Sequence, residues 1–153
     1  RKIENPKIRE LLNNPEKKWF LGIGVGAGLA ELNFLEKLRI PAQNATFLDR
    51  SFLDETRQRL QKKGITVEET SIKEFLPRQT ENFDVVTLFG LDVLLDNQKF
   101  RKALVHYLSK IVSSGGVLVI SPPPSSSQSL ASVLEEYGFT ALDNTRNIYQ
   151  KDE

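Results

Sequence analysis

The segment WFLGIGVGAG, residues 19–28, runs from apolar residues directly into four alternating glycines. Residues 18–23 predict a buried strand. Residues 29–38 predict a helix, because Leu29, Leu32, Leu35 and Leu38 recur at helical spacing. Glycines between a strand and a helix let the backbone approach a ligand closely, since no β-carbon intervenes. The N–H groups at the helix start also favour negative charge. The segment therefore predicts a strand–turn–helix unit with a ligand site at its turn.

An acidic residue follows the next predicted strand. Residues 45–48 predict that strand, and Asp49 ends it, 21 positions after Gly28. A carboxylate there can accept hydrogen bonds from both hydroxyls of a ribose, so the glycines and the acid together indicate a nucleoside site. In the alternative interpretation, the glycines only form a tight turn and Asp49 caps the next helix. That helix is predicted from a capping box, Ser51 to Asp54, to Lys63, with Gly64 ending it.

The rest of the chain continues the alternation of strands and helices. Further strands are expected at 65–68, 83–88 and 117–120, helices at 97–112 and from 128 to 137, a turn at 113–116 and a loop at 122–127. Two short strands, 140–142 and 147–150, close the chain around a turn at 143–145. This order predicts an α/β fold in three layers, with a mostly parallel sheet and a C-terminal antiparallel edge hairpin. Ligands of such sheets bind at the carboxyl ends of the strands, where the strand order reverses.

Composition limits the function further. The chain has 153 residues with 21 basic and 20 acidic side chains, a net charge of +1, which does not support a nucleic-acid partner. It has no cysteine and a single histidine, His106, so disulfides, thiolate sites and multi-histidine metal sites are excluded and no metal is expected. No apolar run suits a membrane helix, and no signal-peptide pattern opens the chain. We expect a cytoplasmic protein that binds no membrane.

Two divisions of the chain are expected. Residues 1–17 form an N-terminal helical segment, with a short helix at 6–12, and residues 18–153 form one domain. Arg1 is not an initiator residue, so we expect the chain to have been trimmed or cut from a longer protein.

Five segments in order resemble class I, Rossmann-like, S-adenosylmethionine-dependent methyltransferases. WFLGIGVGAG is similar to their motif I, and TFLDRSFLDETRQRL to their acid-ended second strand and following helix. ENFDVVTLFGLDVL resembles the fourth strand, LSKIVSSGGVLVIS the helix, glycine turn and fifth strand, and GFTALDNTRNIYQ the closing hairpin. The resemblance covers residues 18–150. It implies an enzyme that uses S-adenosylmethionine to methylate an N or O atom of an acceptor that is a small molecule or is presented by a partner.

The resemblance also implies roles for individual residues. Gly24, Gly26 and Gly28 would line the methionine and ribose parts of the cofactor, and Asp49 would hold the ribose. Cofactor contacts are also implied for Gly22 in motif I, for Arg50, Ser71 and Ile72 around the adenine, and for Leu88, Phe89 and Gly90 beside the methyl group and acceptor. Two positions depart from the family pattern, which usually has an acid at Gly22 and an Asp near Ser71. Each departure removes a polar contact worth about 1–2 kcal/mol.

No side chain stands out as catalytic. The sulfonium methyl is already electrophilic, so a base is needed only where the acceptor must lose a proton. Asp92, after the fourth strand, is the best-placed carboxylate, with helix capping as its alternative role. His106 is expected to have a surface or packing role. The prolines at 122–124 are expected to form a rigid loop, with a place at the edge of the pocket as the alternative.

Several methyltransferase subclasses do not fit. The absence of cysteine excludes methylation at cytosine carbon-5 and radical chemistry. The segment LFGL stands where base amino methyltransferases carry an Asn/Asp-Pro-Pro-aromatic motif, and Asp96 with Asn97 does not match metal-assisted catechol methylation.

Two other functions remain open. Gly22 to Ala27 also matches GxGxxA, which with Asp49 would suit an NAD(P)-binding oxidoreductase domain. A non-catalytic, methyltransferase-like module that binds a protein is suggested by Gly22 and Ser71. Since no acceptor domain is inserted, a partner chain or a part absent from this chain is expected to complete the acceptor site if the acceptor is not small.

Overall fold

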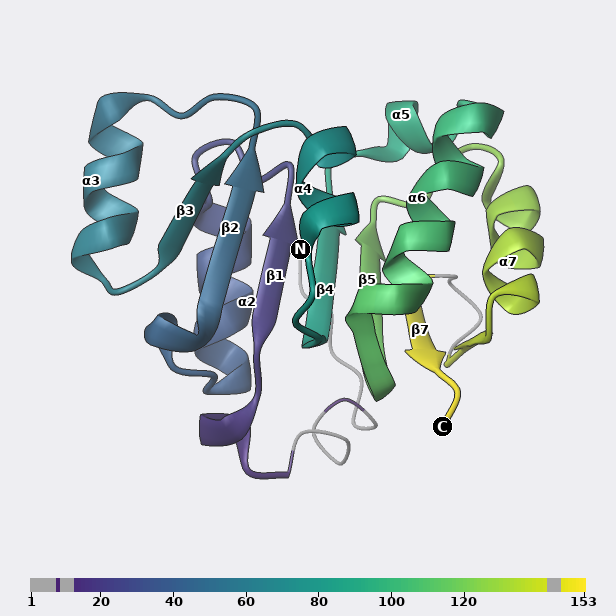
Figure 1. Cartoon of the computed structure of the whole chain (residues 1–153), viewed down its shortest axis with the longest axis horizontal. Coiled ribbons are helices and arrows are strands. Elements are labelled where there is room, and N and C mark those ends of the chain that lie inside the picture. The colour runs from purple at the N-terminus through teal and green to yellow at the C-terminus, as the bar shows by residue number, and fades with distance from the viewer. Residues whose placement is uncertain (1–7, 9–12, 143–146) are drawn as a thin grey trace.

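A seven-stranded sheet forms the centre of the molecule. The computed structural model describes Ile8, residues 13–142 and residues 147–153. The strands are β1 (Phe20–Ile23), β2 (Ala45–Asp49), β3 (Thr66–Glu69), β4 (Phe83–Phe89), β5 (Val112–Ser121), β6 (Phe139–Ala141) and β7 (Ile148–Lys151). They lie side by side in the order β3-β2-β1-β4-β5-β7-β6. Figure 1 labels the strands from β3 at one side to β7. β1 to β5 are parallel, and β7 is antiparallel to both β5 and β6, which confirms the predicted sheet and edge hairpin.

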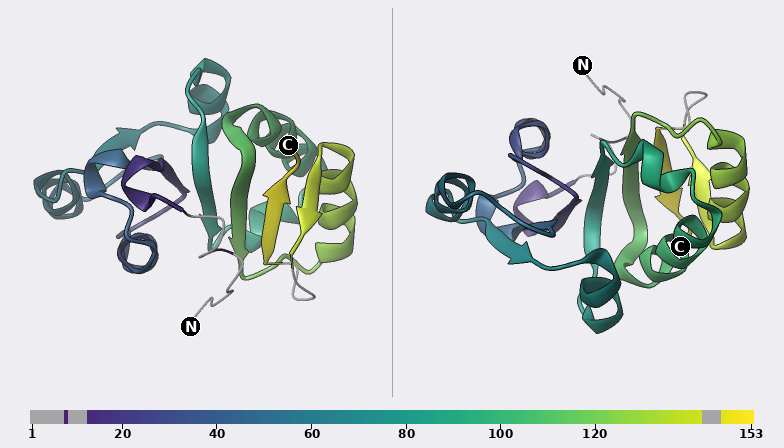
Figure 2. Two further views of the ribbon diagram at one scale, coloured as in Figure 1. Left: turned by 90° about the horizontal axis from the view of Figure 1, so that it is seen from below. Right: turned by 90° about the horizontal axis from the view of Figure 1, so that it is seen from above.

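Helices cover both faces of this sheet. They are α2 (Leu29–Leu38), α3 (Asp54–Lys62), α4 (Ile72–Arg78), α5 (Asp92–Leu95), α6 (Gln98–Ile111) and α7 (Ser127–Glu136), with short 3-10 turns η1 (Pro15–Lys17) and η2 (Ala42–Asn44). α2 and α3 pack on one face, and α4, α6 and α7 on the other (Figure 2). The three-layer arrangement predicted from the sequence is therefore confirmed.

Each face has its own apolar cluster, because successive residues of a strand point to opposite sides. On the α2 face, Phe20, Phe47 and Val85 contribute to one cluster, which Ile8 joins. On the α6 face, Leu21, Leu48 and Val86 contribute to the other, together with the inner faces of α4, α6 and α7. Strands buried on both faces are typical of parallel sheets and explain the continuous apolar runs of β1, β4 and β5.

The carboxyl ends of the five parallel strands share one edge of the sheet, at the top of Figure 1. The strand order reverses between β1 and β4, because β2 follows β1 on one side and β4 lies on the other. A crevice at such a reversal is where ligands of open α/β sheets bind. The glycine turn after β1 lies at this point, as predicted.

The prediction of a capping box at residues 51–54 was wrong. α3 begins at Asp54 after the N-cap residue Leu53, and no side chain caps it. Ser51 and Phe52 belong to the loop after β2, where Phe52 is buried against the α2-face cluster. Burial of that phenylalanine fixes the loop, and the helix starts two residues after it.

The predicted turn at residues 113–116 is absorbed into β5. β5 pairs with β4 at Val112 and again from Val117, opposite Phe83 and Val85, so the intervening residues form a bulge within the strand. Gly115 has a φ of 78° there. The glycines therefore bend the strand and do not interrupt it.

α4 and α5 have seven and four residues, too short for a clear periodic pattern, and were not predicted. The helix expected at 6–12 lies outside the described residues except for Ile8, which is helical and buried. The turn expected at 143–145 also lies outside them. Among the described residues, no helix has the length and apolarity that crossing a membrane requires.

Candidate functional site

The glycine turn after β1 folds over the end of β2. The backbone N–H of Gly24 donates to the carbonyl oxygen of Leu48 at 2.8 Å. The N–H of Gly26 donates to the carboxylate Oδ2 of Asp49 at 2.7 Å. Two segments 23 residues apart are thus joined at the carboxyl edge of the sheet.

Asp49 does not cap α3. Its second oxygen, Oδ1, accepts from the N–H of Arg50 at 2.7 Å, and α3 begins only at Asp54. The half-buried carboxylate therefore faces the glycine turn with both oxygens accepting backbone N–H groups. A carboxylate has about four acceptor positions, so capacity remains for the hydroxyls of a ligand.

A side chain from α3 also holds the turn. The Arg59 guanidinium donates from Nη2 to the carbonyl oxygen of Ala27. Arg59 was not among the predicted site residues, because a basic residue near the end of a helix is a common surface feature. Its contact depends on the way α3 packs beside the turn.

Gly24 is required both by backbone conformation and by space. Its φ is +70°, and an added Cβ would lie 2.7 Å from Cδ2 of Leu91, the residue before α5. Gly26 has a φ of +57°, but an added Cβ there would meet nothing within 4 Å. The turn is therefore tight against Leu91 at one glycine and open at the next.

We expect Gly24→Ala to lower the free energy of unfolding by about 2–3 kcal/mol, through the positive φ and the contact with Leu91. Gly26→Ala is the matched control, because it has the same backbone strain without the contact, and should cost about 1 kcal/mol. Urea denaturation of the three proteins measures the difference. Equal losses in the two variants would show that Leu91 does not restrict the turn.

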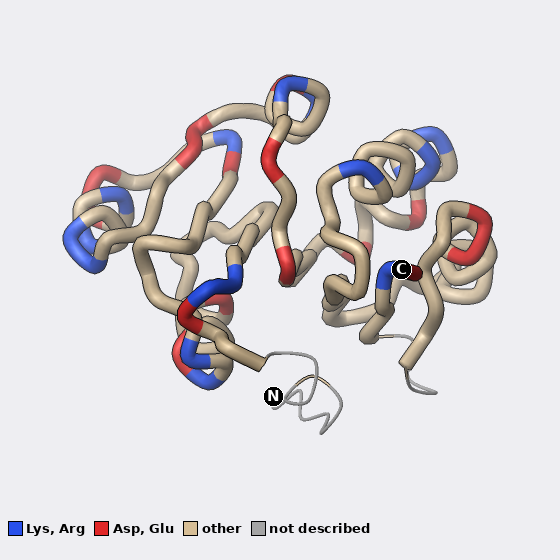
Figure 3. Tube along the Cα trace, turned by 60° about the horizontal axis from the view of Figure 1, so that its bottom comes forward, with Lys and Arg blue, Asp and Glu red and all other residues tan. Residues whose placement is uncertain are grey.

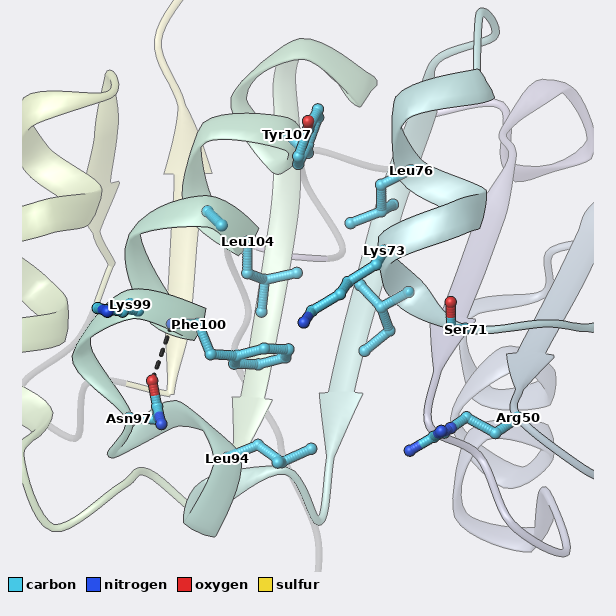
Figure 4. Close-up of a pocket in the computed structure, with 12 residues that line it drawn as sticks. Arg50, Ser71, Lys73, Leu76, Leu94, Asn97, Lys99, Phe100, Leu104 and Tyr107 are labelled. Carbon is cyan, nitrogen blue, oxygen red and sulfur yellow. Dashed lines mark hydrogen bonds between the residues drawn. The ribbon is translucent and has the colours of Figure 1, made fainter.

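Three of the predicted residues line one groove. Arg50, Ser71 and Ile72 contribute to a groove of about 750 Å³ that runs between α4 and α6. Figure 4 shows Arg50 and Ser71 on one side of it, with Leu94 and Phe100 on the other. Its other lining residues are Lys73, Leu76, Asn97, Lys99, Ala103, Leu104 and Tyr107. Ser71 is also the N-cap of α4, where its hydroxyl accepts from the N–H of Glu74 at 3.2 Å.

The three residues that end β4 have different surroundings. Leu88 is 1% exposed and belongs to the α6-face cluster. Phe89 is half-buried, and its ring meets the ring of Phe34 edge-on at 5.8 Å between centroids. Gly90 is exposed, and an added Cβ would meet nothing within 4 Å. Of the three, Gly90 therefore leaves the most room for a ligand, while Leu88 packs the core.

The two carboxylates that follow β4, Asp92 and Asp96, lie in different surroundings. Asp92 is half-buried and is the first residue of α5, whose N-cap is Leu91, so its alternative role as a helix cap is wrong. Asp96 accepts hydrogen bonds from the hydroxyls of Ser125 and Ser126 and from the N–H of Ser126, at 2.6 to 2.9 Å. These bonds, chiefly from Ser126, lower the pKa of Asp96 to about 2. Asp96 thus anchors the loop after β5.

A carboxyl group that the sequence interpretation missed lies beneath the glycine turn. Glu31 of α2 is 2% exposed. Burial raises its pKa to about 7; a backbone hydrogen bond of Glu31 opposes the rise, and the charge of Asp49 adds to it. An added Cβ on Gly22 would lie 3.2 Å from Cγ of Glu31, so the glycine gives this side chain its space.

The inner face of α2 differs from the predicted leucine stripe. Leu29 is 61% exposed, and the buried residues are Glu31, Phe34 and Leu35. Glu31, Phe34, Leu35 and Leu38 have the spacing i, i+3, i+4, i+7 of a helix face. An acid at the first of these positions was the available signal for a buried carboxyl.

Glu31 should make stability depend on pH. Above its usual pKa of 4.5 and up to about 7, the folded protein keeps a proton that the unfolded chain has released. Stability therefore falls as pH rises through this range. We expect wild type to lose about 2 kcal/mol relative to Glu31→Gln between pH 5 and pH 8. Urea denaturation at both pH values measures this loss, and a constant difference between the two proteins would contradict it.

Other candidate groups serve packing. The His106 ring meets the rings of Tyr107 and Tyr137 edge-on at 5.3 and 5.8 Å between centroids, which agrees with the expected packing role. Among the described residues, no three His, Cys, Asp or Glu side chains gather as a metal site requires.

Basic and acidic residues are interspersed along the chain (Figure 3).

Exposed apolar side chains surround the carboxyl edge of the sheet. Leu29 follows the glycine turn, Leu53 follows β2, and Val93 and Leu94 lie in α5 after β4. Their exposed fractions are 61%, 76%, 78% and 47%. Trp19 is also exposed, but it precedes β1 and therefore lies at the opposite edge. Exposed apolar side chains from three segments thus lie around the candidate site.

Comparison of the fold with solved structures finds N-methyltransferases. N-methyltransferase NodS from Bradyrhizobium japonicum WM9 superposes with a TM-score of 0.61 over 97% of this chain and 94% of its own, at 18% identity. Its complex with S-adenosyl-L-homocysteine superposes with a TM-score of 0.62 over 97% of this chain and 87% of its own, at 17% identity. The sugar N-methyltransferase KedS8 from Streptoalloteichus sp ATCC 53650 superposes with a TM-score of 0.68 over 97% of this chain and 85% of its own, at 15% identity. The chain has the Rossmann-like methyltransferase fold. No protein-family model and no curated protein matches the sequence.

The methyltransferase fold bears on the oxidoreductase alternative. Dinucleotide-binding Rossmann folds have the strand order 3-2-1-4-5-6. Here β7 lies between β5 and β6 and is antiparallel to both, as in the closing hairpin that the sequence predicted. The topology therefore favours the methyltransferase fold over a nicotinamide-dependent one.

Proposed function

We propose that this protein binds S-adenosylmethionine and transfers its methyl group to an N or O atom of a small or partner-presented acceptor. The observation that carries the proposal is the junction of Gly26 with the Asp49 carboxylate, at the strand-order reversal of a methyltransferase fold. A nucleoside needs this combination of an acceptor for its ribose and a turn without side chains. The residues present therefore fit the cofactor.

The proposal assigns the predicted site residues to parts of the cofactor. Gly24, Gly26 and Gly28 hold the methionine and ribose parts, and Asp49 accepts from the ribose hydroxyls. Arg50, Ser71 and Ile72 hold the adenine, which is supported by their position along one groove next to the end of β2. Gly90 and Phe89 lie beside the methyl group, with Leu88 packed beneath them. Residues 18–153 are proposed as the cofactor-binding domain.

The protein's part in the reaction is to bind and orient. When bound, S-adenosylmethionine supplies an electrophilic methyl group that needs no further activation. Holding the acceptor atom in line with that methyl accounts for most of the rate such a site provides. Where the acceptor must lose a proton, Asp92 is the proposed base, because it is the half-buried carboxylate next to Gly90 and Leu91.

The acceptor is proposed to have an apolar part. The exposed Leu29, Leu53, Val93 and Leu94 offer apolar contacts around the carboxyl edge. A small molecule supplies these contacts directly, whereas a partner chain or a part absent from this chain does so by covering the edge. The names of NodS and KedS8, an N-methyltransferase and a sugar N-methyltransferase, support a small acceptor methylated on nitrogen. A cytoplasmic setting is proposed for the reaction, in keeping with the absence of cysteine.

Isothermal titration with S-adenosylmethionine, S-adenosylhomocysteine, NADH and NADPH tests the cofactor. We expect micromolar binding of the two sulfur nucleosides and no binding of the nicotinamides. Binding of a nicotinamide in their place would refute the proposal. If none of the four ligands binds, the non-catalytic module is favoured, and the exposed apolar side chains then form its partner surface.

A further inference from the structure

Glu31 is a buried acid without a positive partner. No lysine or arginine of the described chain forms an ion pair with it, and the charged group that acts on it is the anionic Asp49. Its neighbours on the inner face of α2, Phe34 and Leu35, are apolar. An ionised carboxylate in such surroundings is costly unless a cation accompanies it.

The space around Glu31 belongs to the candidate site. Gly22 presents no side chain toward Glu31 and lies two residues before Gly24 in the glycine turn. The next strand places Thr87 beside Gly22 in register, so the Thr87 hydroxyl points to the same sheet face. That hydroxyl is fully buried and has no hydrogen-bond partner. Two buried polar groups thus lie on the α2 face beneath the turn, and the missing side chain of Gly22 is next to both.

We propose that Glu31 is the counter-charge for the α-ammonium group of the bound cofactor, acting from α2 in the place that Gly22 leaves empty on β1. This inference rests on the proposed function. The resemblance implies the methionine end of the cofactor beside these glycines, and that end carries the ammonium. The acid that methyltransferases usually carry at the position of Gly22 is thereby supplied by the following helix.

The pairing makes cofactor binding release a proton. A cation placed near Glu31 favours its ionised form, so binding lowers a pKa that is about 7 in the free protein. The groups around the space that Gly22 leaves are Val25 of the turn, Phe47 of β2 and Glu31 itself. Thr87 of β4 pairs with Gly22 in register, and Asp49 of β2 acts on Glu31 through its charge. Among these groups Asp49 is the other titratable one, and its charge adds to the raised pKa of Glu31. The release between pH 6 and pH 8 is therefore assigned to Glu31.

S-adenosylhomocysteine and 5′-methylthioadenosine separate the two parts of the cofactor. Both carry the nucleoside and a thioether, but only the first carries the amino-acid end. We expect the affinity for S-adenosylhomocysteine to rise about tenfold from pH 6 to pH 8, with about half a proton released at pH 7. Titration calorimetry in buffers of different ionisation enthalpy measures both quantities. The affinity for 5′-methylthioadenosine should stay constant, with no proton release.

Glu31→Gln and Glu36→Gln form a matched pair, because both remove one acid from α2 and Glu36 is exposed. Glutamine resembles the protonated glutamic acid that wild type carries at pH 6, so Glu31→Gln is expected to fold. It should lose the pH dependence and bind S-adenosylhomocysteine at pH 8 about tenfold more weakly, with unchanged binding of 5′-methylthioadenosine. Glu36→Gln should behave as wild type.

The outcomes distinguish this inference from the proposed function. If both ligands bind but S-adenosylhomocysteine shows no proton release, or if Glu31→Gln weakens both ligands equally, the counter-charge is refuted and the cofactor site stands. If neither ligand binds wild type, the proposed function fails, and the inference with it.

Discussion

Replacing Asp49 with alanine should weaken S-adenosylhomocysteine binding by about 100-fold or more. In the proposed site its carboxylate accepts from both ribose hydroxyls, and hydrogen bonds to a charged group contribute about 1.5–3 kcal/mol each. The substitution also removes the acceptor of the Gly26 N–H, whose hydrogen bond of 2.7 Å holds the turn. Isothermal titration of wild type and variant measures the loss.

Asp49→Asn separates these two effects. Its amide oxygen can still accept from Gly26, so the turn remains held, but the charge and half of the acceptor positions are gone. We expect a loss intermediate between wild type and Asp49→Ala, with a melting temperature near that of wild type. Unchanged binding by a folded Asp49→Ala would show that the nucleoside lies elsewhere.

Phe47→Ala should produce the largest loss of stability, about 3–5 kcal/mol in the free energy of unfolding. The ring is fully buried and meets the ring of Phe20 at 6.0 Å between centroids. It also lies directly beneath the glycine turn, because added Cβ atoms on Gly22 and Gly28 would sit 3.4 and 3.3 Å from it. Removing it leaves a cavity between the sheet, α2 and the turn.

Leu53→Ala is the matched control for this loss. Leu53 is also apolar and close to the carboxyl edge, but it is 76% exposed, so its removal should change stability by less than about 0.5 kcal/mol. Urea denaturation of the three proteins compares them at one pH. A small loss in Phe47→Ala would mean that the turn closes over the vacated space.

The sequence revealed the parts of the site that depend on one segment each. The glycines indicate their turn because few other residues adopt its backbone conformation. Asp49 is recognisable because it ends an apolar strand. The parallel pairing of β1 with β2 brings the two to one edge of the sheet, where a hydrogen bond joins them. The fold was predictable for the same reason, since alternating strands and helices allow few arrangements.

The missed features depend on packing between segments. Glu31 is a surface-type residue in an amphipathic helix, and only the rotation of α2, which exposes Leu29, brings it inside. Arg59 contacts Ala27 because α3 lies beside the turn. The false capping box at Ser51 had the correct residue types, but burial of Phe52 moved the helix start. Local patterns do not determine such tertiary effects.

The position of β7 has a consequence for the order in which the protein can be built. Residues 148–151 come after β6 in the chain but lie between β5 and β6 in the sheet. While a ribosome is still synthesising the preceding segment, β5 presents an open edge and β6 has no neighbour. Open edges invite pairing with other chains. The nascent chain is therefore exposed to self-association until these four residues emerge and fill the position between β5 and β6.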